Sequence, residues 1–362
     1  MTQTTDLFAP ITIGDLKLKN RIVMAPMTRS RADERHAPTA MTALYYAQRA
    51  GAGLIISEGT PPDRMGQGYL RVPGIYTPEQ VSAWRTVTDA VHRNGASIFQ
   101  QLMYVGRVSH PSFLDGNTPV GPSPIAVGDG QVFTAMGPQA FVTPRALTAD
   151  EIPEVIATYG RASRMSMEAG FDGVELHATS GYLPAQFLLP TINQRTDDWG
   201  GSLEKRARFL LETVDAMAAV WGPDRVGVRI GPGFTFNDAH DPNPRETWAY
   251  VLPQLARRGL AYLHVIAVPT DWDVLGFARE HWSGVLIANG GYDRARAEAD
   301  LTAGRADLIS FGKPFLANPD LPERLARSAP LTDPDPNHFY SEGPKGYVDY
   351  PALDGQPPEP AL

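Results

Sequence analysis

Short apolar runs alternate with longer helical patterns along the chain, and this alternation constrains the fold more than any other feature. Eight runs have the length and continuous apolar character of strands covered on both faces: 21–27, 53–58, 97–102, 173–177, 226–230, 262–266, 285–288 and 308–311. Helical patterns lie at 78–94, 149–169, 202–220, 245–258, 293–303 and 321–327. This order predicts an α/β fold, a single-domain (β/α)8 TIM barrel over residues 1–362, with an open doubly wound sheet as the alternative.

Three segments lie outside the repeat. Residues 11–18 alternate in polarity around Gly14-Asp15, so we expect residues 1–20 to form an N-terminal hairpin that plugs the barrel floor. Residues 104–147 follow the third strand and are rich in glycine and proline, which predicts a lid over the catalytic face. Residues 328–362 follow the last helix as a C-terminal segment.

Composition narrows the function classes. The net charge is −8 and no basic block occurs, so nucleic acid and anionic membranes are poor partners, and we expect a small-molecule substrate. Cysteine is absent, which removes disulfides, thiolate nucleophiles and cysteine metal sites; without a His-Glu-x-x-His pattern we expect no metal. The start shows no signal peptide, and no run of about 18 apolar residues occurs, so we expect a cytoplasmic protein.

The candidate site follows from where barrel enzymes place their chemistry, just past the carboxyl ends of the strands. There the sequence offers Thr28, Gln101, His177, Tyr182 and Arg229. The patterns of serine hydrolases, Rossmann dinucleotide sites and P-loops are absent. Burying the Arg229 charge on an apolar strand without a partner is costly, so a cofactor or a carboxylate must pair with it.

Glycines follow the last two strands, as the pair Gly290-Gly291 and as Gly312 before Lys313. Open backbone amides at this place bind phosphate in many barrels, although tight turns alone would also explain the glycines. A phosphate site, neutral hydrogen-bond donors and a barrel arginine together suit flavin mononucleotide (FMN). By contrast, His264 on the sixth strand is interpreted as a core residue with satisfied hydrogen bonds.

At these residues the sequence resembles the Old Yellow Enzyme family, FMN-dependent ene-reductases on a (β/α)8 barrel. The resemblance runs nearly end to end, from LFAP at 7–10 to GYVDYP at 346–351. Its longest motifs are RIVMAPMTR at 21–29, QRTDDWGGS at 194–202 and FGKPFLANP at 311–319. It implies an NAD(P)H-dependent flavin oxidoreductase that works by a ping-pong scheme, as a monomer or homodimer.

The resemblance also implies roles for single residues. Thr28 would bond the flavin carbonyl near N5, Gln101 the pyrimidine edge, and Arg229 would stabilise the anionic reduced flavin near N1. His177 would bond the carbonyl or nitro oxygen of an electron-poor alkene, and Tyr182 would give the proton to the α-carbon after hydride reaches the β-carbon. The remaining implied flavin contacts are Pro26, Met27, Gly59, His177, Gly290, Gly291, Gly312 and Lys313. The implied substrate contacts are Tyr69, Met103, His177, Ser180, Tyr182 and Tyr340.

Three positions depart from the family pattern. Ser180 stands where His or Asn is usual, Met103 where many members have Trp, and Lys313 where Arg holds the phosphate. If the shorter Ser180 side chain does not reach the substrate, one oxyanion-type contact is missing, which costs on the order of 10²–10³ in rate. Lysine still binds phosphate, but as a point charge without the guanidinium fork.

Two alternatives remain open at this point. With Ser180 at the second anchor, the same flavin fold could isomerise or desaturate a ring, or reduce nitro and nitrate-ester groups. A barrel that binds a phosphorylated ligand without catalysis is a further hypothesis, from another class of protein. The sequence leaves the natural substrate and the choice between NADPH and NADH undecided.

Overall fold

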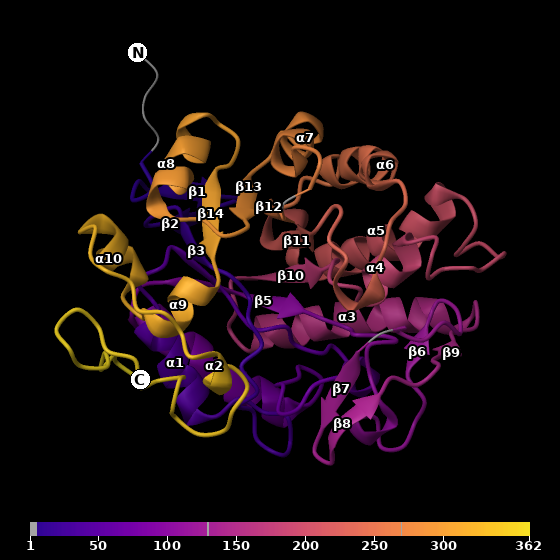
Figure 1. Ribbon diagram of the computed structural model, residues 1–362, viewed down its shortest axis with the longest axis horizontal. Helices are drawn as coiled ribbons and strands as arrows, with labels where there is room; N and C mark the ends of the chain where they lie inside the picture. The colour runs from indigo at the N-terminus through magenta and orange to yellow at the C-terminus, as the bar shows by residue number, and fades with distance from the viewer. Residues whose placement is uncertain (1–5, 129, 269) are drawn as a thin grey trace.

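The computed structural model describes residues 6–128, 130–268 and 270–362. Its centre is a closed parallel barrel whose strands follow one another in chain order (Figure 1). The barrel strands are β3 (Ile22–Met24), β4 (Leu54–Ile56), β5 (Ser97–Leu102), β10 (Gly173–His177), β11 (Val226–Ile230), β12 (Tyr262–Ile266), β13 (Leu286–Asn289) and β14 (Leu308–Phe311). The prediction of a (β/α)8 barrel is confirmed, and the open doubly wound sheet is wrong because β3 pairs with both β14 and β4.

The helices cover the outside of the barrel, as Figure 1 shows. They are α1 (Ala40–Gln48), α2 (Pro78–Arg93), α3 (Glu151–Glu168), α4 (Leu183–Leu188), α5 (Leu203–Trp221), α6 (Pro244–Ala256), α7 (Val274–His281), α8 (Arg294–Thr302), α9 (Lys313–Ala317) and α10 (Leu321–Ala326). The sequence patterns missed α1, α4, α7 and α9, all of nine residues or fewer, because a short helix offers too few turns for a clear period. Among the described residues, no helix combines the length and apolar character needed to cross a bilayer.

Local signals explain where the predicted elements begin and end. The side chain of Thr77 accepts a hydrogen bond from the Gln80 amide in a capping box at the start of α2, and Gly95, with φ of 75°, follows its end. Strand β3 stops at Met24 rather than at residue 27. Pro26 carries no amide hydrogen and cannot continue the ladder, so the chain leaves the sheet there.

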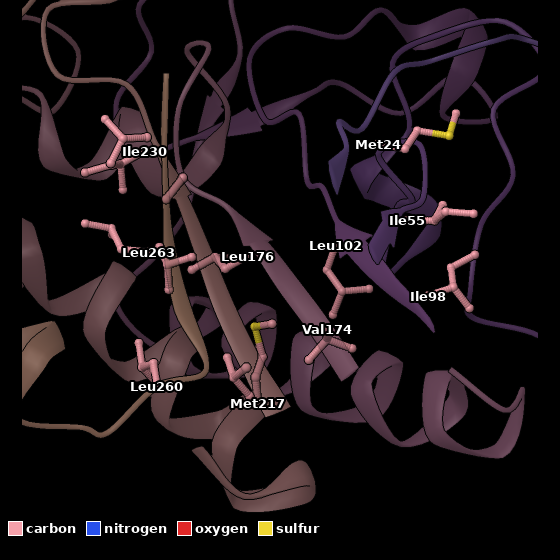
Figure 2. Packing of buried hydrophobic residues seen from close by; sticks show 14 of the residues in the cluster. Met24, Ile55, Ile98, Leu102, Val174, Leu176, Met217, Ile230, Leu260 and Leu263 are labelled. Carbon is pink, nitrogen blue, oxygen red and sulfur yellow. The ribbon is translucent and has the colours of Figure 1, made fainter. Parts of the chain in front are cut away.

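Alternation along the strands separates the two surfaces of the barrel. Val174 and Leu176 pack outward in the core beneath the helices (Figure 2). Glu175 and His177, one step away on the same strand, therefore face the barrel interior. Register brings Glu175 beside Gln101 and His177 beside Arg229 as paired residues on neighbouring strands. The upper interior of the barrel is thus polar.

The floor of the barrel is apolar instead. The predicted N-terminal hairpin is present as β1 (Ile11–Ile13) and β2 (Leu16–Leu18). Ile13 and Leu18 belong to one buried cluster with inward-facing barrel residues such as Phe99 and Tyr262. The hairpin therefore closes the lower end, and ligand access is left to the carboxyl ends of the strands.

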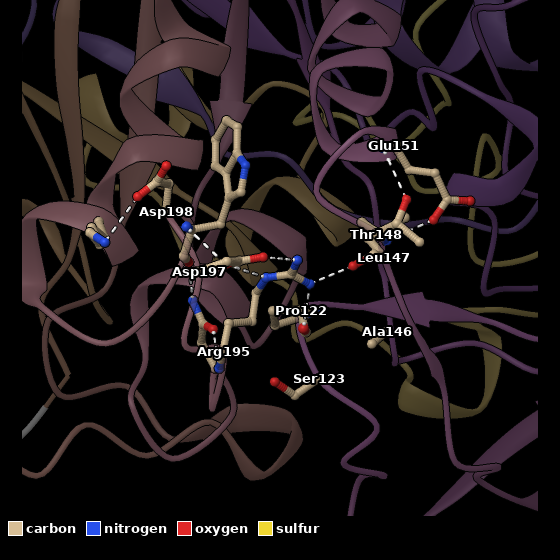
Figure 3. Close-up of polar contacts among 12 residues, drawn as sticks. Pro122, Ser123, Ala146, Leu147, Thr148, Glu151, Arg195, Asp197 and Asp198 are labelled. Atoms are coloured by element: carbon tan, nitrogen blue, oxygen red, sulfur yellow. Dashed lines mark hydrogen bonds and ion pairs between the residues drawn. The ribbon is translucent and has the colours of Figure 1, made fainter.

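The insertion after β5 holds β6 (Val120–Gly121), β7 (Gln131–Thr134), β8 (Gly137–Ala140) and β9 (Arg145–Ala146). Arg195, in the loop after α4, fastens its two ends: the guanidinium donates hydrogen bonds to the carbonyls of Pro122 and Leu147 and pairs with Asp197 (Figure 3). The backbone N–H of Gln194 also donates to the Ser123 hydroxyl at 2.9 Å. The QRTDDWGGS motif therefore anchors the insertion.

Candidate active site

A cavity of about 420 Å³ opens at the carboxyl ends of the barrel strands. It brings together most of the residues expected from the sequence: Pro26, Met27, Thr28, Gly59, Gln101, Met103, His177, Ser180, Tyr182, Arg229, Gly312, Lys313 and Tyr340. Tyr69 lies just behind this lining, in contact with Tyr182. These residues come from distant parts of the chain, and the closed barrel makes them neighbours.

The two glycines after β13 lie differently. Asn289, directly before them, lines the cavity, whereas Gly290 lines a separate hollow with Arg296 and Arg305. Gly290 has φ of 145°, and a Cβ there would come within 2.3 Å of the Ala267 carbonyl oxygen. The turn therefore requires glycine at this position for backbone reasons. The structure does not place Gly290 or Gly291 in the lining of the main cavity.

Arg229 is the buried cation of the cavity. Its Nη2 donates to Asn289 Oδ1 at 3.1 Å, while Nε and Nη1 are buried without a partner. Within the described residues no carboxylate forms an ion pair with it. Burial lowers the pKa of this guanidinium, although it stays charged near neutrality because its ordinary value is so high. Such a group needs an acceptor or an anion from a ligand.

His177 ends β10 and is 8% exposed. Its pKa lies well below the ordinary value, first because burial disfavours the charged ring and then because of the Arg229 charge. The imidazole is therefore neutral at pH 7 and carries one N–H donor. Its Nδ1 is buried without a protein partner. A neutral imidazole at a cavity wall can donate a hydrogen bond to a ligand oxygen.

Tyr182 follows His177 after a tight turn and occupies the N-cap position of α4. Its phenol oxygen lies 2.8 Å from that of Tyr69. Burial, together with Tyr69, raises the pKa of Tyr182 well above its ordinary value, so the phenol stays protonated at physiological pH. Its ring meets His177 edge-on with centroids 4.9 Å apart. A protonated phenol therefore stands beside a neutral imidazole in the same cavity.

Ser180 lies between these two residues in an unusual backbone conformation. Its φ of 60° falls in the left-handed region, and the Asn237 side chain donates to its carbonyl at 2.8 Å. The Ser180 side chain reaches the cavity lining. The tight turn from His177 to Tyr182 is thus held by contacts with the loop after β11.

Several lining residues were not predicted. Phe234 and Phe236 follow β11, and Phe339 precedes Tyr340 in the C-terminal segment. The aromatic pair after Gly233 was a signal that the sequence did offer, since aromatic side chains past a strand end commonly line ligand pockets. Phe339 lies about 110 residues beyond β11 and carries no comparable local signal.

Two buried arginines hold the C-terminal segment against the cavity. Arg31 donates to the carbonyls of Phe339 at 2.8 Å and His338 at 2.9 Å. Arg29 donates to the Gly346 carbonyl at 2.8 Å and stacks over Tyr347. The segment that follows β3 therefore lines the cavity itself and also holds Phe339, another lining residue, in place.

Comparison with known proteins agrees with this geometry. The chain matches the NADH:flavin oxidoreductase / NADH oxidase family over residues 6–332. 12-Oxophytodienoate reductase 1 of Oryza sativa subsp. japonica is 42% identical over 360 residues, covering 96% of this chain and 93% of the relative. A probable flavin mononucleotide-dependent alkene reductase of Leishmania infantum is 42% identical over 355 residues, covering 96% of this chain and 97% of the relative.

Solved structures give the same result. Morphinone reductase superposes with a TM-score of 0.93 at 44% identity, covering 98% of both chains. The Old Yellow Enzyme homologue of Zymomonas mobilis superposes with a TM-score of 0.94 at 40% identity, covering 96% of this chain and all of that one. The hypothesis of a barrel without catalysis is therefore wrong, since the relatives are oxidoreductases over nearly their full length.

The residues present fit the cofactor of this family. The two unpartnered nitrogens of Arg229 and the backbone at Gly312-Lys313 line one cavity, which suits a ligand with an acceptor-rich ring and an anionic tail. The chain belongs to the NADH:flavin oxidoreductase / NADH oxidase family, as a member of the Old Yellow Enzyme group, and is an FMN-dependent oxidoreductase that is reduced by NAD(P)H.

Proposed function

We propose that this protein is an ene-reductase that reduces electron-poor alkenes, conjugated to a carbonyl or a nitro group, in a ping-pong reaction. The observation that carries the proposal is the pair formed by neutral His177 and protonated Tyr182 on the wall of a cavity that also holds Arg229. Relatives named for reducing 12-oxophytodienoate, morphinone and alkenes support the substrate class.

The flavin is proposed to lie across the cavity. Thr28, Gly59, Gln101 and Arg229 would contact its ring, with Pro26 and Met27 beside them, and Lys313 would attract its phosphate at the amide of Gly312. Gly290 and Gly291 remain candidates for the edge of the phosphate site. Asn289 on β13 pairs with Ser310 on β14, so the glycines after Asn289 begin beside the end of β14, which leads to Gly312. When bound, FMN would supply the hydride chemistry, taking a hydride from NAD(P)H and passing one to the β-carbon of the alkene.

The remaining steps belong to the protein. His177 donates its N–H to the carbonyl or nitro oxygen and so withdraws electron density from the alkene. The Ser180 hydroxyl stands at the second anchor position, and Tyr69, Met103 and Tyr340 bound the substrate space. Tyr182 gives a proton to the α-carbon, and its phenol is held for this purpose by Tyr69. NAD(P)H and one proton are consumed for each alkene reduced.

A second candidate function keeps the flavin and changes the acceptor. Ser180 is shorter than the usual His or Asn, and it lines the cavity with a backbone φ of 60°. A site with one strong oxygen anchor suits nitro or nitrate-ester reduction, or isomerisation and desaturation of a ring.

An anaerobic half-reaction experiment separates the two. The FMN-loaded protein is reduced with NADPH and then mixed with 2-cyclohexenone, with a nitroalkene, or with a nitrate ester, while flavin absorbance is followed. Reoxidation by the enone or nitroalkene, with formation of the saturated product, is the expected result. If the enone and the nitroalkene leave the flavin reduced while the nitrate ester reoxidises it, the ene-reductase proposal fails. The Tyr182→Phe variant is the control for the proton step.

A further inference from the structure

A chain of buried polar side chains lies inside the barrel, beneath the cavity. Glu175 is at its centre: Oε1 accepts from Gln101 Nε2 at 2.7 Å, and Oε2 lies 2.9 Å from His264 Nδ1. His264 Nε2 lies in turn 2.8 Å from the Ser310 hydroxyl. All four residues are at most 2% exposed, and they come from β5, β10, β12 and β14.

We propose that Glu175 is a positioning residue of the flavin site, which fixes the direction of the Gln101 amide and supplies the negative charge that balances Arg229. The proposal rests on the placement of FMN under "Proposed function" and extends it to a residue that does not line the cavity. Glu175 acts through Gln101 and through its charge.

The first part of the argument concerns the Gln101 amide. Gln101 Nε2 donates to Glu175 Oε1, so the NH2 end of the amide faces Glu175. The amide oxygen is then left for the cavity, which Gln101 lines. The site consequently presents an acceptor and selects a ligand with a hydrogen-bond donor at that point, as the imide N–H of an isoalloxazine provides. Without Glu175 either end of the amide could face the ligand.

The second part concerns charge. Arg229 makes no ion pair in the described part of the chain, yet it shares the barrel interior with Glu175, whose charge acts on it. The other titratable groups that face this space are neutral: burial lowers the pKa of His177 and His264, and it raises that of Tyr262. Among the described residues that face the barrel interior, Arg229 is thus the cationic side chain and Glu175 the acidic one. A ligand that gains negative charge on reduction is stabilised by Arg229 and opposed by Glu175.

Glu175→Gln separates the two effects. The new amide can accept a hydrogen bond from Gln101 and donate one to His264 Nδ1. For this, His264 must take the tautomer with its proton on Nε2, which then donates to the Ser310 hydroxyl. The hydrogen bonds thus persist while the charge is lost. We expect the midpoint potential of bound FMN to move positive by about 30 mV or more, which is a tenfold change for two electrons. FMN affinity of the apoprotein, measured by quenching of flavin fluorescence, should change less than threefold.

Two further variants complete the test. Gln101→Leu keeps the charge and removes the amide, so FMN affinity should fall about tenfold, the value of one good hydrogen bond. Ser310→Ala is the matched control, because it removes a hydroxyl at the far end of this series of hydrogen bonds and leaves Glu175 and Gln101 in contact. The midpoint potential of bound FMN should stay within error of wild type. Circular dichroism of each apoprotein verifies folding.

The outcomes are distinct. An unchanged or more negative potential in folded Glu175→Gln overturns the charge argument, and unchanged FMN affinity in Gln101→Leu overturns the amide argument. If Glu175→Gln does not fold, Gln101→Leu still tests the amide argument. Should Arg229→Met and Gln101→Leu both leave FMN binding intact, the placement of the flavin itself is wrong. If Arg229→Met weakens FMN binding while Glu175→Gln leaves the potential unchanged, only the present inference fails.

Discussion

The phenol oxygens of Tyr69 and Tyr182 lie 2.8 Å apart, with their rings nearly perpendicular at 84°. Tyr69 belongs to the loop after β4, and Tyr182 begins α4 after β10, so two crossovers of the barrel meet at one hydrogen bond. The pKa of each phenol is raised, chiefly by burial. Both phenols therefore stay protonated at neutral pH, joined by one hydrogen bond.

Replacing Tyr182 should affect the proton step most. We expect Tyr182→Phe to lower the rate of alkene reduction by about 10²–10⁴, the usual contribution of a general acid. Tyr69→Phe removes the partner and keeps the donor, so a fall of roughly tenfold is expected. Stopped-flow reoxidation of the NADPH-reduced protein by 2-cyclohexenone measures both. Tyr250→Phe on α6, away from the cavity, is the matched control, and an unchanged rate in Tyr182→Phe would show that another group gives the proton.

The pH profile should be flat where histidine normally titrates. His177 has a pKa well below 6.5, so the ring stays neutral as pH rises from 6 to 9 and its donor is retained. Tyr182 has a pKa well above 10 and stays protonated over the same range. The rate of reoxidation by the enone should therefore vary less than about threefold between pH 6 and 9. A sigmoidal step centred near 6.5 would contradict the neutral state of His177.

Ser180→Asn tests the second oxygen anchor. The position has φ of 60°, a region in which Asn is enriched several-fold over most residues, so the variant should fold without added strain. The longer amide brings an N–H donor nearer to the substrate oxygen, and we expect enone reduction to accelerate about tenfold. Ser180→Ala, which lacks any donor, is the control and should not accelerate it. A slower Asn variant would instead favour the second candidate function.

Glu58 predicts a pH dependence of stability. The carboxyl is buried at the end of β4, where it accepts from the Arg29 amide at 3.1 Å, and burial raises its pKa to about 7. Between the ordinary value of 4.5 and about 7, the folded protein binds more protons than the unfolded chain does, so stability falls as pH rises through this window and levels off above it. The total change is on the order of 3 kcal/mol.

Glu58→Gln keeps an acceptor for the Arg29 amide and removes the ionisation. Urea unfolding of FMN-loaded wild type and variant at pH 5, 6, 7 and 8 should show a stability difference in favour of the variant that grows from pH 5 to 7 and then levels off. Equal pH dependence in the two proteins would mean that Glu58 ionises normally in the folded state.

The barrel could be predicted because its signals are local. A strand buried on both faces must be continuously apolar, and the capping pair Thr77 and Gly95 marks a helix within its own sequence. The inward direction of Arg229 and His177 likewise follows from the period of two along each strand. The short helices were missed because they offer too few turns for a clear period, and the end of β3 was misplaced because Pro26 and the neighbouring strands decide it.

The resemblance to a family supplied the expected roles, and the structure shows which of those residues meet. The contacts that the sequence did not indicate join distant residues through groups that every amino acid carries. Arg31 holds the carbonyl of Lys345, 314 positions away, and Arg107 donates to the carbonyls of Ala126 and Asn237. A backbone carbonyl leaves no mark in the sequence, so such contacts exist only once the chain has closed.

Glu175 shows the same division within the site. By itself the sequence determined that a charged residue stands on an apolar strand two positions before His177, and hence that both face the barrel interior. Only the tertiary structure decided that this carboxylate meets Gln101 and His264, because the closure and register of strands β5, β10 and β12 set which inward side chains come within hydrogen-bonding distance.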